Sequence, residues 1–237
     1  MFFILPIVGV IFGILGIGAG IIMLPLFTLL YDLTFTSAVN LTLLTTSLMA
    51  LVGIIININS INYKIGIKYF LFSSIGAFIG SIFSTQIPDM FKEVVFLSII
   101  IYVLLINPKT NSKNKSTFAF IMLTITTGLL TSIIGVGGGF LILPILIYFF
   151  NLTIKEAIQT SFFIVFLNTF TSLLFNIYLN NNSSELLTLI ISNKYELSLL
   201  IIFFIFGRFL SKKISENITT KLYKSLLIIS AGLTIYN

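Results

Sequence analysis

Apolar runs long enough to cross a bilayer recur from one end of the chain to the other. A helix needs about 20 residues to cross a hydrocarbon core of roughly 30 Å. Hydrophobic residues make up 57% of the 237 residues and charged residues only 8%, so we predict an all-α polytopic membrane protein. The apolar runs fall at residues 2–31, 38–58, 69–87, 94–106, 118–150, 156–179, 196–214 and 222–236.

Glycine clusters interrupt the two longest runs in the same way. The first reads GIGAGIIMLP from Gly16, and the second reads GVGGGFLILP from Gly135. Placing residue n on residue n + 119 gives ten identities in the thirty positions 9–38, among them Pro25 with Pro144. Chance likeness between apolar segments does not concentrate at glycine and proline, so we predict a tandem duplication, the common construction of secondary transporters.

The duplication divides the chain into two membrane repeats. After an insertion around residues 180–185 the offset becomes 127, which aligns Gly80 with Gly207. The second half of each repeat is therefore also matched, although more weakly than the first. We assign residues 1–106 to the N-terminal repeat, residues 107–117 to a linker and residues 118–237 to the C-terminal repeat.

The distribution of lysine and arginine predicts that the repeats insert in opposite directions. If all eight runs crossed the membrane, the basic residues would divide six to seven between its two sides. The glycine-broken runs, of about 30 and 33 residues, would also form helices of roughly 45–50 Å. If each run instead turns back at its glycines, the division is eleven to two, and the richer side, with the linker, is cytoplasmic. Each inverted repeat then holds one re-entrant helix pair and three transmembrane helices, with both termini outside.

We predict that the two glycine turns bind an anion near the membrane midplane. Glycine permits a sharp change of backbone direction, and the helix that restarts after it presents free N–H groups and a partial positive charge. Pro25 and Pro144 support this restart, since proline is tolerated near helix N-termini. Close helix packing is the alternative role of such glycines. The predicted backbone contacts are Gly16, Gly18, Ala19, Gly20, Gly135, Gly137, Gly138 and Gly139.

Polar residues follow each turn on the next predicted helix. Asn40 aligns with Gln159, and Thr42 aligns with Ser161. Their amides and hydroxyls could bond the oxygens of an anion, or they could bond carbonyls of their own helix instead. The predicted side-chain contacts are Asn40, Thr42, Thr45, Thr46, Gln159, Thr160 and Ser161.

Other glycines and polar tracts receive structural interpretations. The GxxxG spacing of Gly9 with Gly13 and of Gly76 with Gly80 predicts close helix packing. The tract Asn193–Ser198 is predicted to be an outer loop.

Several function classes lack the residues that they require. The chain has no cysteine and no histidine, and it shows no nucleophile–base pair, so we expect neither an enzyme nor a metal or cofactor site. The net charge of +6 is dispersed over short loops, which argues against nucleic-acid binding. Arg208 is interpreted as extending to the cytoplasmic interface; the alternative is a cation that attracts substrate at the cytoplasmic mouth.

The sequence resembles the sulfite exporter TauE/SafE family of membrane permeases. The resemblance rests on GIGAGIIMLP and GVGGGFLILP, on the helix starts AVNLTLLTTSL and AIQTSF, and on GRFLSKKI near the C-terminus. It implies transport of small anions such as sulfite, organosulfonates or related carboxylates.

The resulting hypothesis is a secondary transporter of a small anion in the cell membrane, working by alternating access. A cation or metal permease and a non-transporting scaffold or assembly protein are the alternatives. The expected partners are the anion and the lipid bilayer. A proton or sodium ion as coupling ion and a homo-oligomeric state are both left open.

Overall fold

The computed structural model describes residues 4–16, 20–31, 33–84, 86–105, 116–135, 137–180, 183–211 and 213–236. Within these ranges the chain forms eleven α-helices, one 3-10 helix and no β-strand. The elements are α1 (Ile4–Leu15), α2 (Gly20–Tyr31), α3 (Phe35–Ile56), η1 (Ile58–Ser60), α4 (Tyr63–Ser84), α5 (Asp89–Leu105), α6 (Thr117–Ile134), α7 (Gly139–Phe150), α8 (Ile154–Asn180), α9 (Ser183–Ser192), α10 (Lys194–Ser211) and α11 (Glu216–Tyr236).

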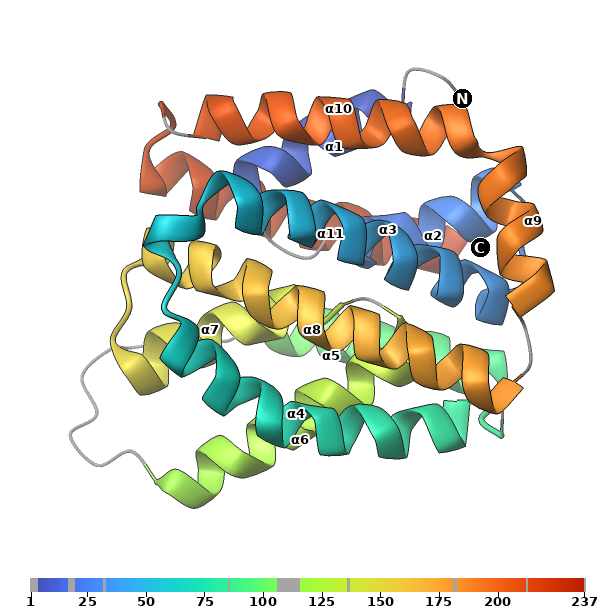
Figure 1. Ribbon diagram of the computed structural model, residues 1–237, viewed down its shortest axis with the longest axis horizontal. Helices are drawn as coiled ribbons and strands as arrows, with labels where there is room; N and C mark the ends of the chain where they lie inside the picture. The colour runs from blue at the N-terminus through green and yellow to red at the C-terminus, as the bar shows by residue number, and fades with distance from the viewer. Residues whose placement is uncertain are drawn as a thin grey trace.

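Two long helices, α3 and α8, pack antiparallel in the middle of the molecule (Figure 1). Near the start of α3, Asn40 bonds Asn176 at the end of α8, whereas Gly53 near the end of α3 lies against Phe162 near the start of α8. Among the described residues, four helices are long and apolar enough to cross a membrane, namely α3, α4, α6 and α8. The prediction of a polytopic, helical membrane protein is confirmed.

The outer surface of the bundle is apolar. On α4, the exposed side chains include Ile67, Leu71, Ile75 and Phe78, which recur at three- and four-residue spacing along one face. Such a continuous apolar stripe is unfavourable in water and is typical of a helix that contacts lipid.

Short helices flank both glycine clusters. The helices α1, α2 and α7 have 12 residues each, which is about 18 Å of helix and too little to cross the hydrocarbon core. In Figure 1, α1 enters from the right-hand end and α2 returns to it, while α6 enters from the left-hand end and α7 returns to it. The two helix pairs therefore enter the bundle from opposite ends.

Glycines bring two pairs of helices into backbone contact. A Cβ atom on Gly9 of α1 would lie 2.6 Å from the carbonyl oxygen of Leu200 in α10. In the other pair, a Cβ on Gly80 of α4 would lie 2.5 Å from the carbonyl oxygen of Leu129 in α6. The predicted packing role of the glycine pairs on α1 and α4 is confirmed.

The repeats exchange equivalent contacts. Under the offset of 119, Gly16 corresponds to Gly135 and Val39 corresponds to Ile158. In the structure, a Cβ on Gly16 would meet the side chain of Ile158, and a Cβ on Gly135 would meet that of Val39. Each glycine turn is therefore packed against the long helix of the other predicted repeat.

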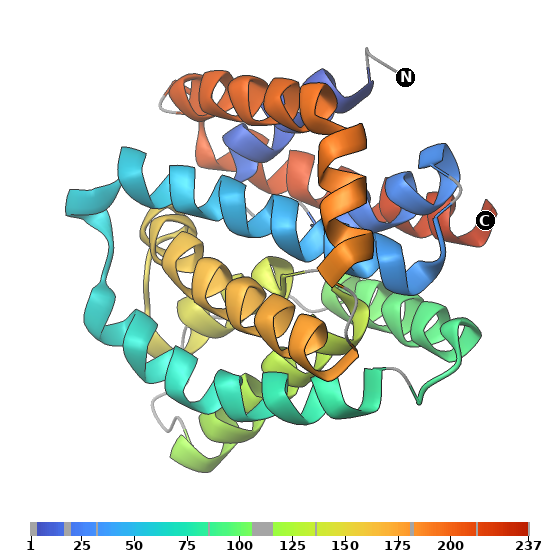
Figure 2. The ribbon, with the colours of Figure 1, turned by 45° about the vertical axis from the view of Figure 1, so that its right-hand side comes forward.

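One predicted loop is helical. Asn193–Ser198 was expected to be solvated loop, but α10 begins at Lys194, and Asn193 joins it to α9, which stands across the ends of its neighbours (Figure 2). The Asn193 amide donates to the Leu189 carbonyl at the end of α9, and the Asn193 carbonyl accepts from the Leu197 N–H. Asn193 thus satisfies both helix ends, and only a tight turn separates them. Of the linker 107–117, residues 107–115 lie outside the described residues, while Ser116 caps α6.

Candidate functional site

The second glycine turn is built from left-handed backbone. Gly135 ends α6 with φ +75°, and Gly137 and Gly138 have φ +71° and +66°. Residues with a Cβ atom are strained at these positive φ angles, whereas glycine is not. The chain can therefore change direction here at little cost in free energy because these three residues are glycine. Helix α7 begins at Gly139, and no side chain caps its N-terminus. The predicted helix break is present, with an uncapped helix start behind it.

The first turn begins in the same manner. Gly16 has φ +61°, its N–H donates to the Phe12 carbonyl at the end of α1, and Gly20 is the first residue of α2. Gly18 and Ala19 lie outside the described residues. Pro25 and Pro144 lie inside α2 and α7, so each proline falls in the second turn of its helix rather than at the first residue.

The second turn faces both central helices. A Cβ on Gly137 would lie 2.9 Å from Cγ2 of Thr46 on α3 and 3.0 Å from Cγ2 of Thr169 on α8. Asn168, the residue before Thr169 on α8, accepts from the Ser73 hydroxyl of α4 at 2.7 Å. The turn therefore adjoins a buried polar cluster between the helices. We call this the central cluster, and its members are Asn40, Thr42, Thr46, Asn168, Thr169, Ser172 and Asn176.

Several polar atoms of the central cluster lack partners. A buried donor or acceptor without a hydrogen bond costs about 1–3 kcal/mol, so native proteins contain few of them. Five such atoms lie on α3 and α8 among the described residues that pack between these helices, and one of their residues, Thr46, adjoins the Gly137 turn. The unpartnered atoms are Thr42 Oγ1, Thr46 Oγ1, Asn168 Nδ2, Ser172 Oγ and Asn176 Oδ1.

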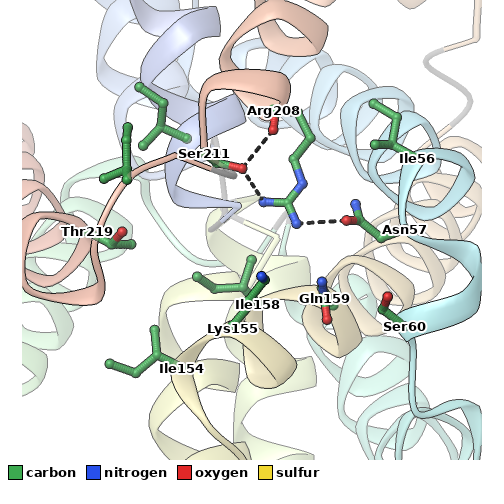
Figure 3. Close-up of a pocket in the computed structure, with 12 residues that line it drawn as sticks. Ile56, Asn57, Ser60, Ile154, Lys155, Ile158, Gln159, Arg208, Ser211 and Thr219 are labelled. Carbon is green, nitrogen blue, oxygen red and sulfur yellow. Dashed lines mark hydrogen bonds between the residues drawn. The ribbon is translucent and has the colours of Figure 1, made fainter.

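Arg208 occupies a second polar region, shown in Figure 3. Its side chain is only 6% exposed, and its guanidinium donates to Asn57 Oδ1 at 2.9 Å and to Ser211 Oγ at 3.1 Å. The guanidinium carbon Cζ of Arg208 lies 5.1 Å from the centre of the Phe162 ring. The side-chain amide oxygen of Asn57, the residue that follows α3, therefore holds the Arg208 guanidinium in a buried position near the end of α10, so the side chain is not extended into solvent.

The family model described as "Sulfite exporter TauE/SafE" matches residues 1–235. The chain belongs to the sulfite exporter TauE/SafE family. A similar curated protein is the "Probable membrane transporter protein YunE" of Bacillus subtilis (strain 168), which is 27% identical over 207 residues, covering 72% of this chain and 76% of the relative. No solved structure matches the chain significantly. The family and the apolar helices make this a multi-pass membrane transporter of the permease type.

In this TauE/SafE member, some of the side chains predicted to contact the anion have polar atoms without partners, and others are bonded within their own helix. Thr42 and Thr46 lie in the central cluster with free hydroxyls, and Asn40 joins it by accepting from Asn176 at 3.3 Å. By contrast, the Thr45 hydroxyl donates to the Leu41 carbonyl of its own helix.

On α8, the three predicted residues lie away from the Gly137 turn. The Ser161 hydroxyl donates to the Ile158 carbonyl, and the Thr160 hydroxyl accepts from the Asn62 N–H. Gln159 lines the cavity beside Arg208 (Figure 3).

Sequence reasoning missed the α8 half of the central cluster. Asn168, Ser172 and Asn176 recur every four residues, which places them on one face of a helix that is otherwise largely apolar. This periodicity is visible in the sequence. These residues lie about two to four helical turns beyond Ser161, so their distance along the chain from the glycine turn gave no reason to place them beside it.

Proposed function

We propose that this transporter binds a small anion, such as sulfite, an organosulfonate or a related organic anion, between the second glycine turn and the central cluster. The observation that carries the proposal is the set of unpartnered buried polar atoms between α3 and α8, of which Thr46 lies beside the Gly137 turn that precedes α7. The uncapped N-terminus of α7 supplies backbone N–H groups and a partial positive charge. Hydroxyls of Thr42 and Thr46 and the amide of Asn168 are donors of the kind that anion oxygens accept.

The chemistry of the central cluster favours an anion over a cation. Its members carry hydroxyls and amides, and none is a carboxylate, the ligand that hard cations prefer. A scaffold protein gains nothing from unpartnered polar groups in its interior, since each one destabilises the fold. A transporter, in contrast, uses unpartnered polar groups as hydrogen-bond donors to the anion that it carries.

Alternating access is supported by the arrangement of the repeats. The equivalent helices α3 and α8 run in opposite directions, and the two glycine-turn pairs enter from opposite ends (Figure 1). We infer an inverted pair of repeats in the cell membrane, with the linker on the cytoplasmic side and both termini outside. Rocking of one repeat against the other would then expose the site to each side in turn.

The topology can be checked with single cysteines, because the native chain contains none. Thr117 starts α6, and Glu156 lies in the first turn of α8. If α6 and α7 form a re-entrant pair, Thr117→Cys and Glu156→Cys should both be labelled by a membrane-impermeant reagent only from the cytoplasmic side. Gln86→Cys, between α4 and α5, should be labelled only from outside. Labelling of positions 117 and 156 from opposite sides would contradict the re-entrant pair.

Removal of one free hydroxyl tests the binding site. Thr46→Val keeps the shape of the side chain, so we expect anion flux to fall about tenfold or more while thermal stability is unchanged or raised. Flux of sulfite, ethanesulfonate and acetate would be measured in proteoliposomes. The matched control is Thr126→Val, which removes an exposed hydroxyl that bonds its own helix. Equal flux in the two variants would refute the site, and absence of flux in the unmodified protein would refute the function.

A further inference from the structure

A cavity of about 340 Å³ lies where the end of α3 meets the start of α8 and the end of α10 (Figure 3). Arg208 and Lys155 supply its charge, and Asn57, Gln159 and Ser60 supply neutral polar groups. Ser211 and Thr219 also line it, and isoleucines form the rest of the wall, namely Ile14, Ile56, Ile154, Ile158 and Ile214. The cavity therefore combines cations, neutral hydrogen-bonding groups and an apolar surface.

The charge of Arg208 is not neutralised by a carboxylate among the described side chains. Its hydrogen-bond acceptors are the neutral side chains of Asn57 and Ser211, and its Nε–H is unpartnered. Burying a cation without a counter-charge is costly, so buried cations are normally paired. At the opposite end of the molecule Lys92, which is 2% exposed, follows this rule by pairing with Asp89 at 2.8 Å.

The fold does not require a cation at position 208. Under the offset of 127, Arg208 corresponds to Ser81 of the first repeat, where the small hydroxyl bonds Ser132 across the α4–α6 contact. Lys155 corresponds to Thr36 under the offset of 119. The first repeat thus has a small polar residue in both places; the buried cation that contacts Thr36 there, Lys92, is paired with Asp89, whereas Arg208 has no carboxylate partner among the described side chains. The unpaired charge at position 208 is therefore a feature of the cavity and not of the shared fold.

The cavity is distinct from the central cluster. Asn57 follows Thr46 by eleven residues along α3, and Gln159 precedes Thr169 by ten along α8, so the two regions are about 15 Å apart along both helices. A ligand that contacts Arg208 cannot at the same time contact the Gly137 turn unless it is long.

We propose that this cavity is a second anion-binding site, which takes a small organic anion with one carboxylate or sulfonate group and a short apolar body. The anionic group bonds the guanidinium of Arg208, a charge-assisted contact, and the apolar body lies on the isoleucines. The volume of about 340 Å³ is roughly ten times that of a water molecule, so there is room for an apolar body beside the anionic group. The inference does not depend on transport, because binding here can be measured by itself.

A fluorophore placed at the cavity tests this directly. Ser60 lines the cavity and is exposed, so Ser60→Cys can carry an environment-sensitive dye in a chain with no other cysteine. In nanodiscs of phosphatidylcholine, propanesulfonate and butyrate should give a saturable signal at lower concentrations than sulfate. Arg208→Gln should raise the half-saturating concentration about tenfold or more. Lys221→Gln removes an exposed charge outside the cavity on α11 and should leave the signal unchanged.

Three results would overturn the proposal. They are no saturable signal with either organic anion, equal affinity in Arg208→Gln and Lys221→Gln, and a signal that appears only when phosphatidylglycerol replaces part of the neutral lipid. The last result would assign the cavity to a lipid headgroup. If Arg208→Gln does not insert, Lys155→Gln provides the second variant, with weaker binding as the expected result. Because the dye reports on the cavity, binding without any flux would leave this inference standing while refuting the proposed transport.

Discussion

Gly137→Ala is expected to reduce anion flux by at least about tenfold while leaving an inserted, folded protein. The residue has φ +71°, a conformation that costs a side-chain-bearing residue about 1–2 kcal/mol. The added Cβ would also lie 2.9 Å from Thr46 Cγ2, closer than such atoms approach, and 3.0 Å from Thr169 Cγ2, a distance that few such atoms show. The turn must therefore shift away from the central cluster, and displacement of a binding group by a fraction of an ångström to 1 Å is enough to cost one to two orders of magnitude in rate.

The matched control is Gly232→Ala in α11. A Cβ at Gly232 meets nothing within 4 Å, so the same chemical change is made in open space. Flux per inserted molecule should equal that of the unmodified protein, and thermal stability should be unchanged or slightly raised, because alanine favours helix over glycine. If Gly137→Ala transports as well as Gly232→Ala, the second glycine turn is not the binding site.

Gly128→Ala is expected to damage folding rather than transport alone. A Cβ at Gly128 of α6 would overlap the carbonyl oxygen of Ser73 in α4, so two helix backbones must separate to admit it. Overpacking of this kind costs about 1–3 kcal/mol, and here the obstructing atom is backbone that cannot rotate away. The fraction of protein that is monodisperse after extraction and its melting temperature should both fall relative to Gly232→Ala.

The equivalent glycine of the other repeat provides a second test of the same cause. Gly9 aligns with Gly128 under the offset of 119, and its added Cβ would lie 2.6 Å from the Leu200 carbonyl oxygen. Gly9→Ala should therefore destabilise the α1–α10 contact and lower the melting temperature relative to Gly232→Ala, as Gly128→Ala does for the α4–α6 contact. A melting temperature unchanged in both variants would show that the two helix pairs are looser than their backbones indicate.

Local features of the chain were predictable from the sequence because their causes are local. The helix break at Gly135 to Gly138 follows from the backbone freedom of glycine, and the apolar helices follow from bilayer length. The packing of Gly9 and Gly80 was also predictable, since small residues at four-residue spacing permit close approach of helices. The start of α10 at Lys194 was not, because the single turn at Asn193 depends on capping at two helix ends.

The choice between a free and an internally bonded hydroxyl needed the tertiary structure. Thr45 and Thr46 are adjacent in the sequence and equally polar, but Thr45 bonds the Leu41 carbonyl and Thr46 does not. The difference depends on which face of α3 meets the glycine turn and α8. No local pattern distinguishes the two residues.

By itself, the sequence determined that this chain lies in a membrane and that its helices are broken at glycine, because hydropathy and backbone freedom are properties of neighbouring residues. The duplication stays a prediction from the sequence. The tertiary structure alone decided which polar groups are left without partners and that Arg208 is buried. Arg208 bonds Asn57, 151 residues away along the chain, and the cavity beside them is lined by residues of α1, α3, α8, α10 and α11, which must all meet to form it. Burial and hydrogen bonding across helices depend on where distant segments lie, and that information is not contained in any short stretch of the chain.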